Sequence, residues 1–106
     1  MTKVEKHKEW CDNLHALYEI KNNAYGDSFG ETYKKLGIIS AVTRISDKYN
    51  RLVNLATHPE IDVNDESLVD TLVDLANYSI MTAMELGITK ENKIADQVAD
   101  ALAYTE

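Results

Sequence analysis

The chain has 106 residues, enough for one hydrophobic core and too few for two, so we expect a single domain over 1–106. Its 18 acidic and 11 basic residues give a net charge of −7. This balance argues against binding of nucleic-acid polymers, which requires clustered Lys and Arg. One cysteine, Cys11, excludes an intramolecular disulfide and is typical of a reducing compartment. The sequence shows neither a signal peptide nor an apolar run of membrane-spanning length, so we expect a cytoplasmic protein without a membrane partner.

The first two predicted helices flank a short loop. Apolar residues recur with helical spacing over 4–24 and again over 31–57. Between them, Tyr25–Gly30 contains two glycines and an Asp-Ser pair, which predicts a loop. The second helix should end at His58, because the residue before a proline avoids the α region.

Two further helices are predicted after this proline. Asn64 or Asp65 can cap a third helix that continues to Leu86, and Gly87 stands where a left-handed cap is expected. Thr89 opens a short fourth helix over about 89–104. No segment alternates with the period of a strand, so we predict an all-α fold, an antiparallel bundle of about four helices.

The third helix carries an acidic stripe on an otherwise apolar surface. At about 100° per residue, Glu66, Asp70, Asp74 and Asn77 share one side, and Met81 continues it. A helix that is apolar nearly all round should be buried, so this stripe should face protein. Buried carboxylates are costly unless they are paired or bound to a cation, and the stripe therefore predicts a positive partner.

The second helix carries a mixed stripe of Arg44, Asp47, Lys48 and Arg51. One interpretation is a solvated face in which Asp47 pairs with its own neighbours. An antiparallel arrangement of the second and third helices would instead bring the Asp47 region level with the Asp74 region. The two stripes would then form a cleft whose carboxylates hold Mg²⁺ and whose cations hold phosphate. A structural salt-bridge network between the helices, or a polar seam in an oligomer, is the alternative for the acidic stripe.

Particular residues follow from the cleft interpretation. Asp70 and Asp74, four residues apart, have the spacing to share one ion, and Asp47 would complete the set from the second helix. Tyr25 and Phe29 are candidates for stacking on a base. Their alternative role is to pack into the core beside the loop. The third helix also has more apolar circumference than a small monomer can cover, which predicts a homodimer or a homotetramer with its sites near the interface.

Three blocks of sequence together resemble a known family. They are YGDSF at 25–29, GIISAVTRISDKYNRL at 37–52 and ESLVDTLVDLANY at 66–78. In this order they resemble the phage and bacterial nucleotide modification associated domain family, which is similar to the MazG-like all-α nucleoside triphosphate pyrophosphatases. The resemblance covers about residues 15–87.

The MazG resemblance implies an oligomeric helical bundle that binds a nucleotide through Mg²⁺, with Mn²⁺ as a substitute. Enzymes of that superfamily cleave nucleoside triphosphates between the α and β phosphates, with ligands from a Glu-x-x-Glu and a Glu-x-x-Asp motif. Asp70 takes the Asp position of the second motif, while Ser67 stands at its Glu position. Arg44 and Asp47 replace the two acids of the first motif.

Two functions are consistent with these residues. The first is Mg²⁺-dependent hydrolysis of a (deoxy)nucleoside triphosphate or modified nucleotide. The second is a non-catalytic phage-type protein that sequesters a signalling nucleotide, such as a cyclic one, in the host cytoplasm to counter host defence. For the enzyme, the predicted roles are metal ligands Asp47, Asp70 and Asp74, general base Glu66, phosphate contacts Arg44, Lys48 and Arg51, and base contacts Tyr25, Phe29 and Asn77.

Overall fold

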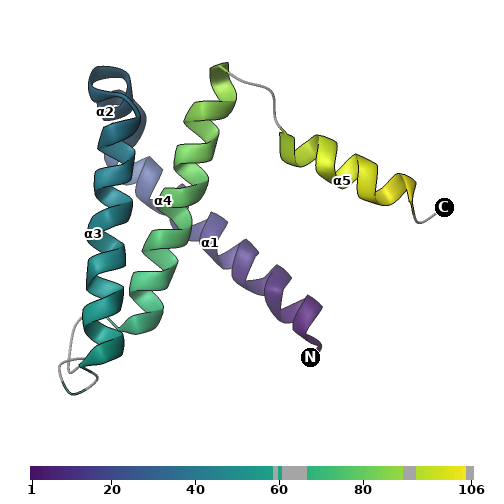
Figure 1. Cartoon of the computed structure of the whole chain (residues 1–106), viewed down its shortest axis with the longest axis horizontal. Helices are drawn as coiled ribbons and strands as arrows, with labels where there is room; N and C mark the ends of the chain where they lie inside the picture. Colours follow the sequence, from purple (N-terminus) through teal and green to yellow (C-terminus); the bar gives the residue numbers. More distant parts are fainter. Residues whose placement is uncertain (59, 61–66, 90–92, 105–106) are drawn as a thin grey trace.

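Every regular element among the described residues is a helix, which confirms the all-α prediction. The computed structural model describes residues 1–58, 60, 67–89 and 93–104 (Figure 1). The helices are α1 (Lys3–Tyr25), α2 (Ser28–Leu36), α3 (Ile38–Thr57), α4 (Leu68–Thr89) and α5 (Lys93–Ala103).

Helix α1 begins and ends where the sequence predicts. A capping box starts it: the Thr2 hydroxyl oxygen accepts a hydrogen bond from the Glu5 backbone N–H at 3.1 Å, and the Glu5 carboxylate accepts one from the Thr2 N–H at 3.0 Å. At the other end, Gly26 adopts φ 67°, a value that favours glycine. The chain leaves the helix axis there, because a left-handed residue cannot continue an α-helix.

The predicted helix over 31–57 is wrong in one respect, because it is two helices. Gly37 has φ 76° and ψ −164° and separates α2 from α3. The predicted Tyr25–Gly30 loop is correspondingly shorter, since α2 already begins at Ser28. Asp27 caps α2 by accepting a hydrogen bond from the Gly30 N–H at 3.1 Å. A Cβ on Gly30 would collide with the Asp27 carboxylate, so a larger residue here would displace this cap.

The start of α4 depends on a cap that the sequence reading missed. Asn64 and Asp65 lie outside the described residues, and Ser67 supplies the cap. The Ser67 hydroxyl accepts from the Asp70 N–H at 3.1 Å, and the Asp70 carboxylate accepts from the Ser67 N–H at 3.3 Å. The predicted cap at Gly87 is wrong: α4 runs to Thr89, and α5 starts later than predicted, at Lys93.

Helices α3 and α4 form the central antiparallel pair (Figure 1). Helix α2 packs against this pair, α1 crosses behind α4, and α5 points away from the bundle. The most buried side chains come from α2, α3 and α4. They are Phe29, Ala41, Leu55, Thr71 and Thr82. Both buried threonines donate their hydroxyl to the carbonyl four residues earlier in α4, so burial leaves no unmet hydrogen bond there.

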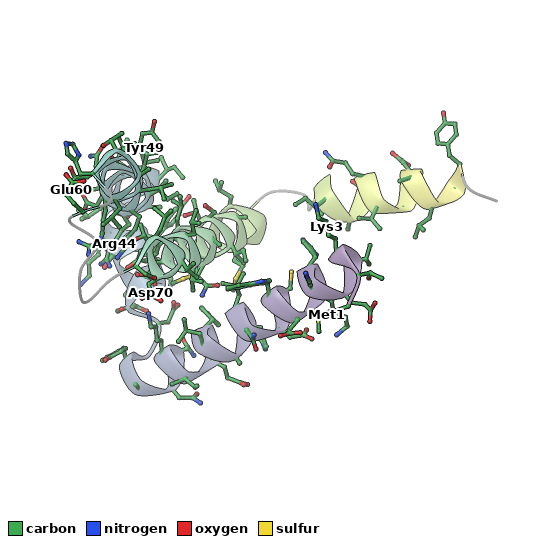
Figure 2. All side chains as sticks on the ribbon, turned by 90° about the horizontal axis from the view of Figure 1, so that it is seen from below. Met1, Lys3, Arg44, Tyr49, Glu60 and Asp70 are labelled. Atoms are coloured by element: carbon green, nitrogen blue, oxygen red, sulfur yellow. The ribbon has the colours of Figure 1, made fainter. Side chains whose placement is uncertain are left out.

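Side chains divide the α3–α4 pair into two faces. Arg44 and Asp70 lie on the side that faces α1, and Tyr49 lies on the opposite side of α3 (Figure 2). Charged residues gather on the first side and apolar residues on the second. In the parts of the chain that the structure describes, none of the helices has the length and apolar character needed to cross a membrane.

Candidate functional site

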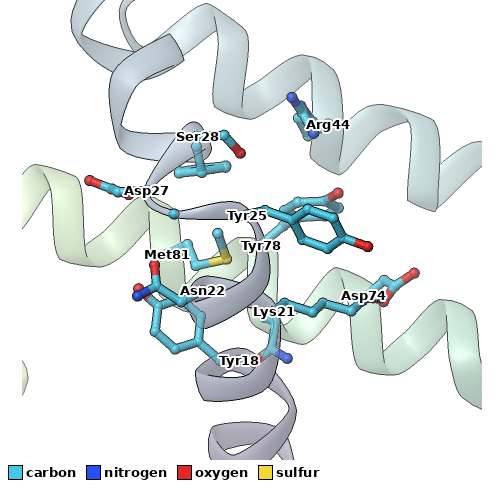
Figure 3. Close-up of a pocket in the computed structure, with 13 residues that line it drawn as sticks. Tyr18, Lys21, Asn22, Tyr25, Asp27, Ser28, Arg44, Asp74, Tyr78 and Met81 are labelled. Atoms are coloured by element: carbon cyan, nitrogen blue, oxygen red, sulfur yellow. Dashed lines mark ion pairs between the residues drawn. The ribbon is translucent and has the colours of Figure 1, made fainter.

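A cavity of about 360 Å³ lies where α1, the start of α2, α3 and α4 meet (Figure 3). Helix α1 contributes Tyr18, Lys21, Asn22 and Tyr25, whose i, i+3, i+4, i+7 spacing places them on one face of the helix. Helix α4 contributes Asp74 and Asn77 of the acidic stripe, together with Tyr78 and Met81, from the other side. The cavity therefore depends on the crossing of α1 over α4, two elements far apart in sequence.

One end of the cavity is aromatic. The Phe29 and Tyr78 rings stack with centroids 6.0 Å apart and an interplanar angle of 22°. The Arg44 guanidinium lies 5.9 Å from the Tyr78 centroid, within cation–π distance. Tyr25 lines the same end and is exposed, whereas Phe29 is buried. An incoming flat group can therefore reach Tyr25 and Tyr78 more readily than Phe29.

The other end of the cavity is charged. Here Asp74 of the acidic stripe meets the positive partners that the sequence predicts. The Lys48 Nζ lies 2.9 Å from one oxygen of Asp74, and the Lys21 Nζ lies 3.6 Å from the other. Lys21 extends along the cavity wall toward Asp74 (Figure 3). The pairing of Lys48 with Asp74 confirms that the second and third predicted helices are antiparallel and in the expected register.

A second cavity of about 320 Å³ adjoins the first through Lys21 and Asp74. It is also lined by Lys48 and Asp70, so two carboxylates and two ammonium groups face one space. Asp70 uses one oxygen to cap α4. The two cavities share Lys21 and Asp74 as lining residues, and we call them together the groove, which has an aromatic end and a charged end.

Residues 21–86 match the family described as nucleotide modification associated domain 1. The chain belongs to this family. The matched segment contains every cavity residue named above except Tyr18, so the aromatic end and the charged end are both part of the family domain. The family's description associates it with nucleotides. No curated protein and no solved structure matches the chain.

The remaining predicted site residues do not line the cavities, lie outside the described residues or make another contact. Neither of these two cavities is lined by Asp47 or Arg51, and Glu66 lies outside the described residues. Asn77 lines the main cavity but donates its side-chain amide to the Leu14 carbonyl at 3.4 Å, which ties α4 to α1. Within the described ranges, no three His, Cys, Asp or Glu side chains group closely enough to hold a metal by themselves.

Sequence reasoning missed the contribution of α1 to the cavity, which comes from Tyr18, Lys21 and Asn22, and it gave no role to Tyr78 of α4. The spacing of Tyr18, Lys21, Asn22 and Tyr25 was the available signal on the first helix. Such a spacing shows that the residues share one face of a helix, but not which element packs against that face.

Proposed function

We propose that this family member binds a nucleotide in the groove, with the base against Tyr25 and Tyr78 and the phosphates near Lys21, Arg44 and Lys48. The observation that carries this proposal is the convergence of Lys21 and Lys48 on Asp74 beside an aromatic wall. A volume of about 360 Å³ lies in the range of small-molecule sites. Local cations allow an anion to bind although the net charge is −7.

Hydrolysis of a (deoxy)nucleoside triphosphate or modified nucleotide is the activity that we propose for the groove when it holds Mg²⁺ or Mn²⁺. Mg²⁺ usually needs only one or two carboxylates in addition to substrate phosphates, and Asp70 and Asp74 face one cavity. The Lys48 ammonium already occupies a cation position at Asp74. When bound, the ion would polarise the phosphates and lower the pKa of an attacking water. Asp47 as a third ligand and Glu66 as the base stay proposals.

Sequestration without cleavage is the second candidate, and a specific observation favours it. Asp74 is balanced by two lysines, and Asp70 is engaged in the cap of α4. The groove is therefore complete as an electrostatic unit without an ion. Lysines that exchange a carboxylate for phosphates would hold a signalling nucleotide intact, as a phage-type protein that counters host defence would in the host cytoplasm.

Mass spectrometry of the nucleotide that copurifies with the protein tests both candidates. A sequestering protein should return its ligand unchanged after denaturation. An enzyme should return product and release pyrophosphate from a nucleoside triphosphate when Mg²⁺ is added. Absence of any bound nucleotide, together with no binding of nucleoside mono-, di- or triphosphates or cyclic dinucleotides in titrations, would refute the proposed function.

Arg44→Met tests the placement of the phosphates. Loss of a charge-assisted contact, worth about 1.5–3 kcal/mol, should weaken nucleotide binding by roughly 10- to 100-fold in isothermal titration calorimetry. Lys34→Met is the matched control, since Lys34 is exposed on α2, lines neither cavity and pairs within its own helix with Glu31 at 3.7 Å. Equal losses in the two variants would show that net charge, and not the groove, sets the affinity.

A further inference from the structure

Asn22 lines the main cavity between Tyr18 and Tyr25 of the same helix. The three residues are spaced i, i+4 and i+7, so their side chains follow one another along the face of α1 that borders the cavity. The Asn22 residue is half-buried. In Figure 3, Asn22 and Tyr18 lie on one side of the cavity and Asp74 on the other, with Lys21 extending toward Asp74. Asn22 therefore lies away from the charged end of the groove.

The side-chain amide of Asn22 is unengaged in the part of the chain that the structure describes, where it makes no hydrogen bond. Two other polar side chains of the cavity are used within the protein. Asn77 donates to the Leu14 carbonyl at 3.4 Å. Asp27 accepts a hydrogen bond from the Gly30 N–H at 3.1 Å. Asn22 thus offers a ligand both groups of an amide, the N–H donors and the carbonyl acceptor.

The two ends of the groove determine which part of a nucleotide reaches Asn22. The ammonium groups of Lys21 and Lys48 converge at the charged end, which is the proposed place of the phosphates. Tyr25 and Tyr78 supply the aromatic wall for the base. A base that stacks on this wall has its edge free, and the edge that points away from the phosphates is the part nearest Asn22. Ligand sites commonly use a few placed polar groups of this kind to set orientation and specificity.

We infer that Asn22 forms a hydrogen bond with the exocyclic group on the edge of the base, an inference that rests on the proposed nucleotide site. The amide presents its carbonyl to an amino group, as in cytosine or adenine. After a rotation of about 180° it presents its N–H group to an oxo group, as in uracil or hypoxanthine. Since no described residue holds the amide in one orientation, both are available. The substrate class is therefore nucleotides with either an amino or an oxo group at this position.

Asn22→Asp tests this role, because a carboxylate only accepts hydrogen bonds. It can accept from a base amino group, whereas it repels an oxo group. Isothermal titration calorimetry in EDTA would compare cytidine with uridine triphosphate, and adenosine with inosine triphosphate. In wild type the affinities within a pair should differ by less than about threefold. In Asn22→Asp the amino member should be favoured by roughly 10- to 100-fold, because the oxo member loses its hydrogen bond and faces a negative charge.

Asn23→Asp is the matched control for the added charge. Asn23 is the next residue of α1, is exposed and lines neither cavity, and its substitution changes the net charge equally. This variant should keep the wild-type ratio of affinities within each pair. The ratio is the informative quantity, because both members of a pair carry the same triphosphate and are repelled equally by an added carboxylate.

Asn22→Ala distinguishes a contact with the base from a contact with the phosphates, and it replaces Asn22→Asp if circular dichroism shows that variant to be unfolded. Loss of the hydrogen bond should weaken binding of both members of a pair by roughly 3- to 10-fold. The affinity for inorganic tripolyphosphate should be unchanged, because that ligand has no base.

Three results would overturn the role of Asn22. They are an unchanged amino-to-oxo ratio in Asn22→Asp, equal losses for nucleotide and tripolyphosphate in Asn22→Ala, and a wild type that already separates a pair by more than about tenfold. The last result would show that a fixed group, and not an adaptable amide, reads the base. In each case the nucleotide still binds, and the proposed function stands. A wild type that binds no nucleotide would refute the proposed function and the role of Asn22 together.

Discussion

Asp74→Asn is the most informative single change, because the proposed function gives Asp74 two opposing roles: it competes with phosphate for the lysines, and it holds the metal ion when one is bound. In the structure its carboxylate holds the ammonium groups of Lys21 and Lys48. A phosphate that binds these lysines must compete with Asp74 and lie close to its negative charge. Replacement by Asn keeps the shape of the side chain and removes the charge.

The magnitude follows from the geometry. A phosphate oxygen about 2.8 Å from the Lys48 Nζ would lie about 5 Å from the Asp74 oxygen, if the two acceptors subtend a tetrahedral angle at the nitrogen. The Asp74 oxygen is 2.9 Å from the same nitrogen. Two unit charges about 5 Å apart repel by about 3 kcal/mol at an effective dielectric constant of 20 and by about 0.8 kcal/mol in water. The Asp74 side chain is 25% exposed, so a value of about 1–2 kcal/mol, or roughly 5- to 30-fold in affinity, applies.

Isothermal titration calorimetry with a nucleoside triphosphate measures the effect under two conditions. In EDTA, Asp74→Asn should bind more tightly than wild type by the factor above. In Mg²⁺, wild type should gain affinity and Asp74→Asn should gain less, because one of the two carboxylates facing the ion has been removed. The advantage of Asp74→Asn over wild type should therefore be smaller in Mg²⁺ than in EDTA.

Asp100→Asn is the matched control, since it changes the net charge equally and Asp100 is exposed on α5 and lines neither cavity. Its effect should be small in both buffers. If Asp74→Asn weakens binding in EDTA, phosphates do not compete with Asp74 for the lysines, and the proposed phosphate position is wrong. If both variants strengthen binding equally, the change in net charge, and not the position of Asp74, explains the effect.

Two further predictions concern stability. Gly37→Ala should lower the free energy of unfolding by about 1–2 kcal/mol in urea titrations, because φ 76° is strained for alanine; Gly87→Ala, inside α4 with open space around the new Cβ, should instead raise it by about 0.5–1 kcal/mol. Hydrogen bonds from the Thr2 backbone and hydroxyl lower the pKa of Glu5, so its capping contribution is present at neutral pH and lost as the pH falls through that lowered value. The protection of first-turn amides of α1, measured as exchange relative to the intrinsic rate at each pH, should fall at low pH in wild type and show no such fall in Glu5→Gln.

The sequence by itself determined the all-α fold and the register of the central pair. Thr2 with Glu5 and His58 before proline mark helix ends through local hydrogen bonding and sterics, which neighbouring residues settle. The antiparallel pairing followed from a short connection, and it brought Lys48 to Asp74 at 2.9 Å. The family, too, was readable from motif order alone and is confirmed over 21–86.

Local signals were ambiguous at glycines and at caps. Gly37 interrupts a continuous apolar period, and Gly87 sits inside a helix although it resembles a cap. A glycine permits positive φ without requiring it, so the packing of α2 on α3 decides between a break and a continuous helix. Ser67 was read as a departure from a metal motif, and it caps α4.

Only the tertiary structure decided what the acidic stripe of α4 meets. The sequence predicted a positive partner and assigned Lys48 on the neighbouring helix to phosphate, whereas in the structure Lys48 pairs with Asp74, and Lys21 joins it only because α1 crosses α4. The same crossing brings Tyr18 and Tyr25 to the groove and places Asn77 against the Leu14 carbonyl. Helical periodicity tells which residues share a face, because that depends on the rotation per residue. It cannot tell which face meets which, because that depends on the direction in which a helix leaves its loop, and here two residues, Gly26 and Asp27, set that direction.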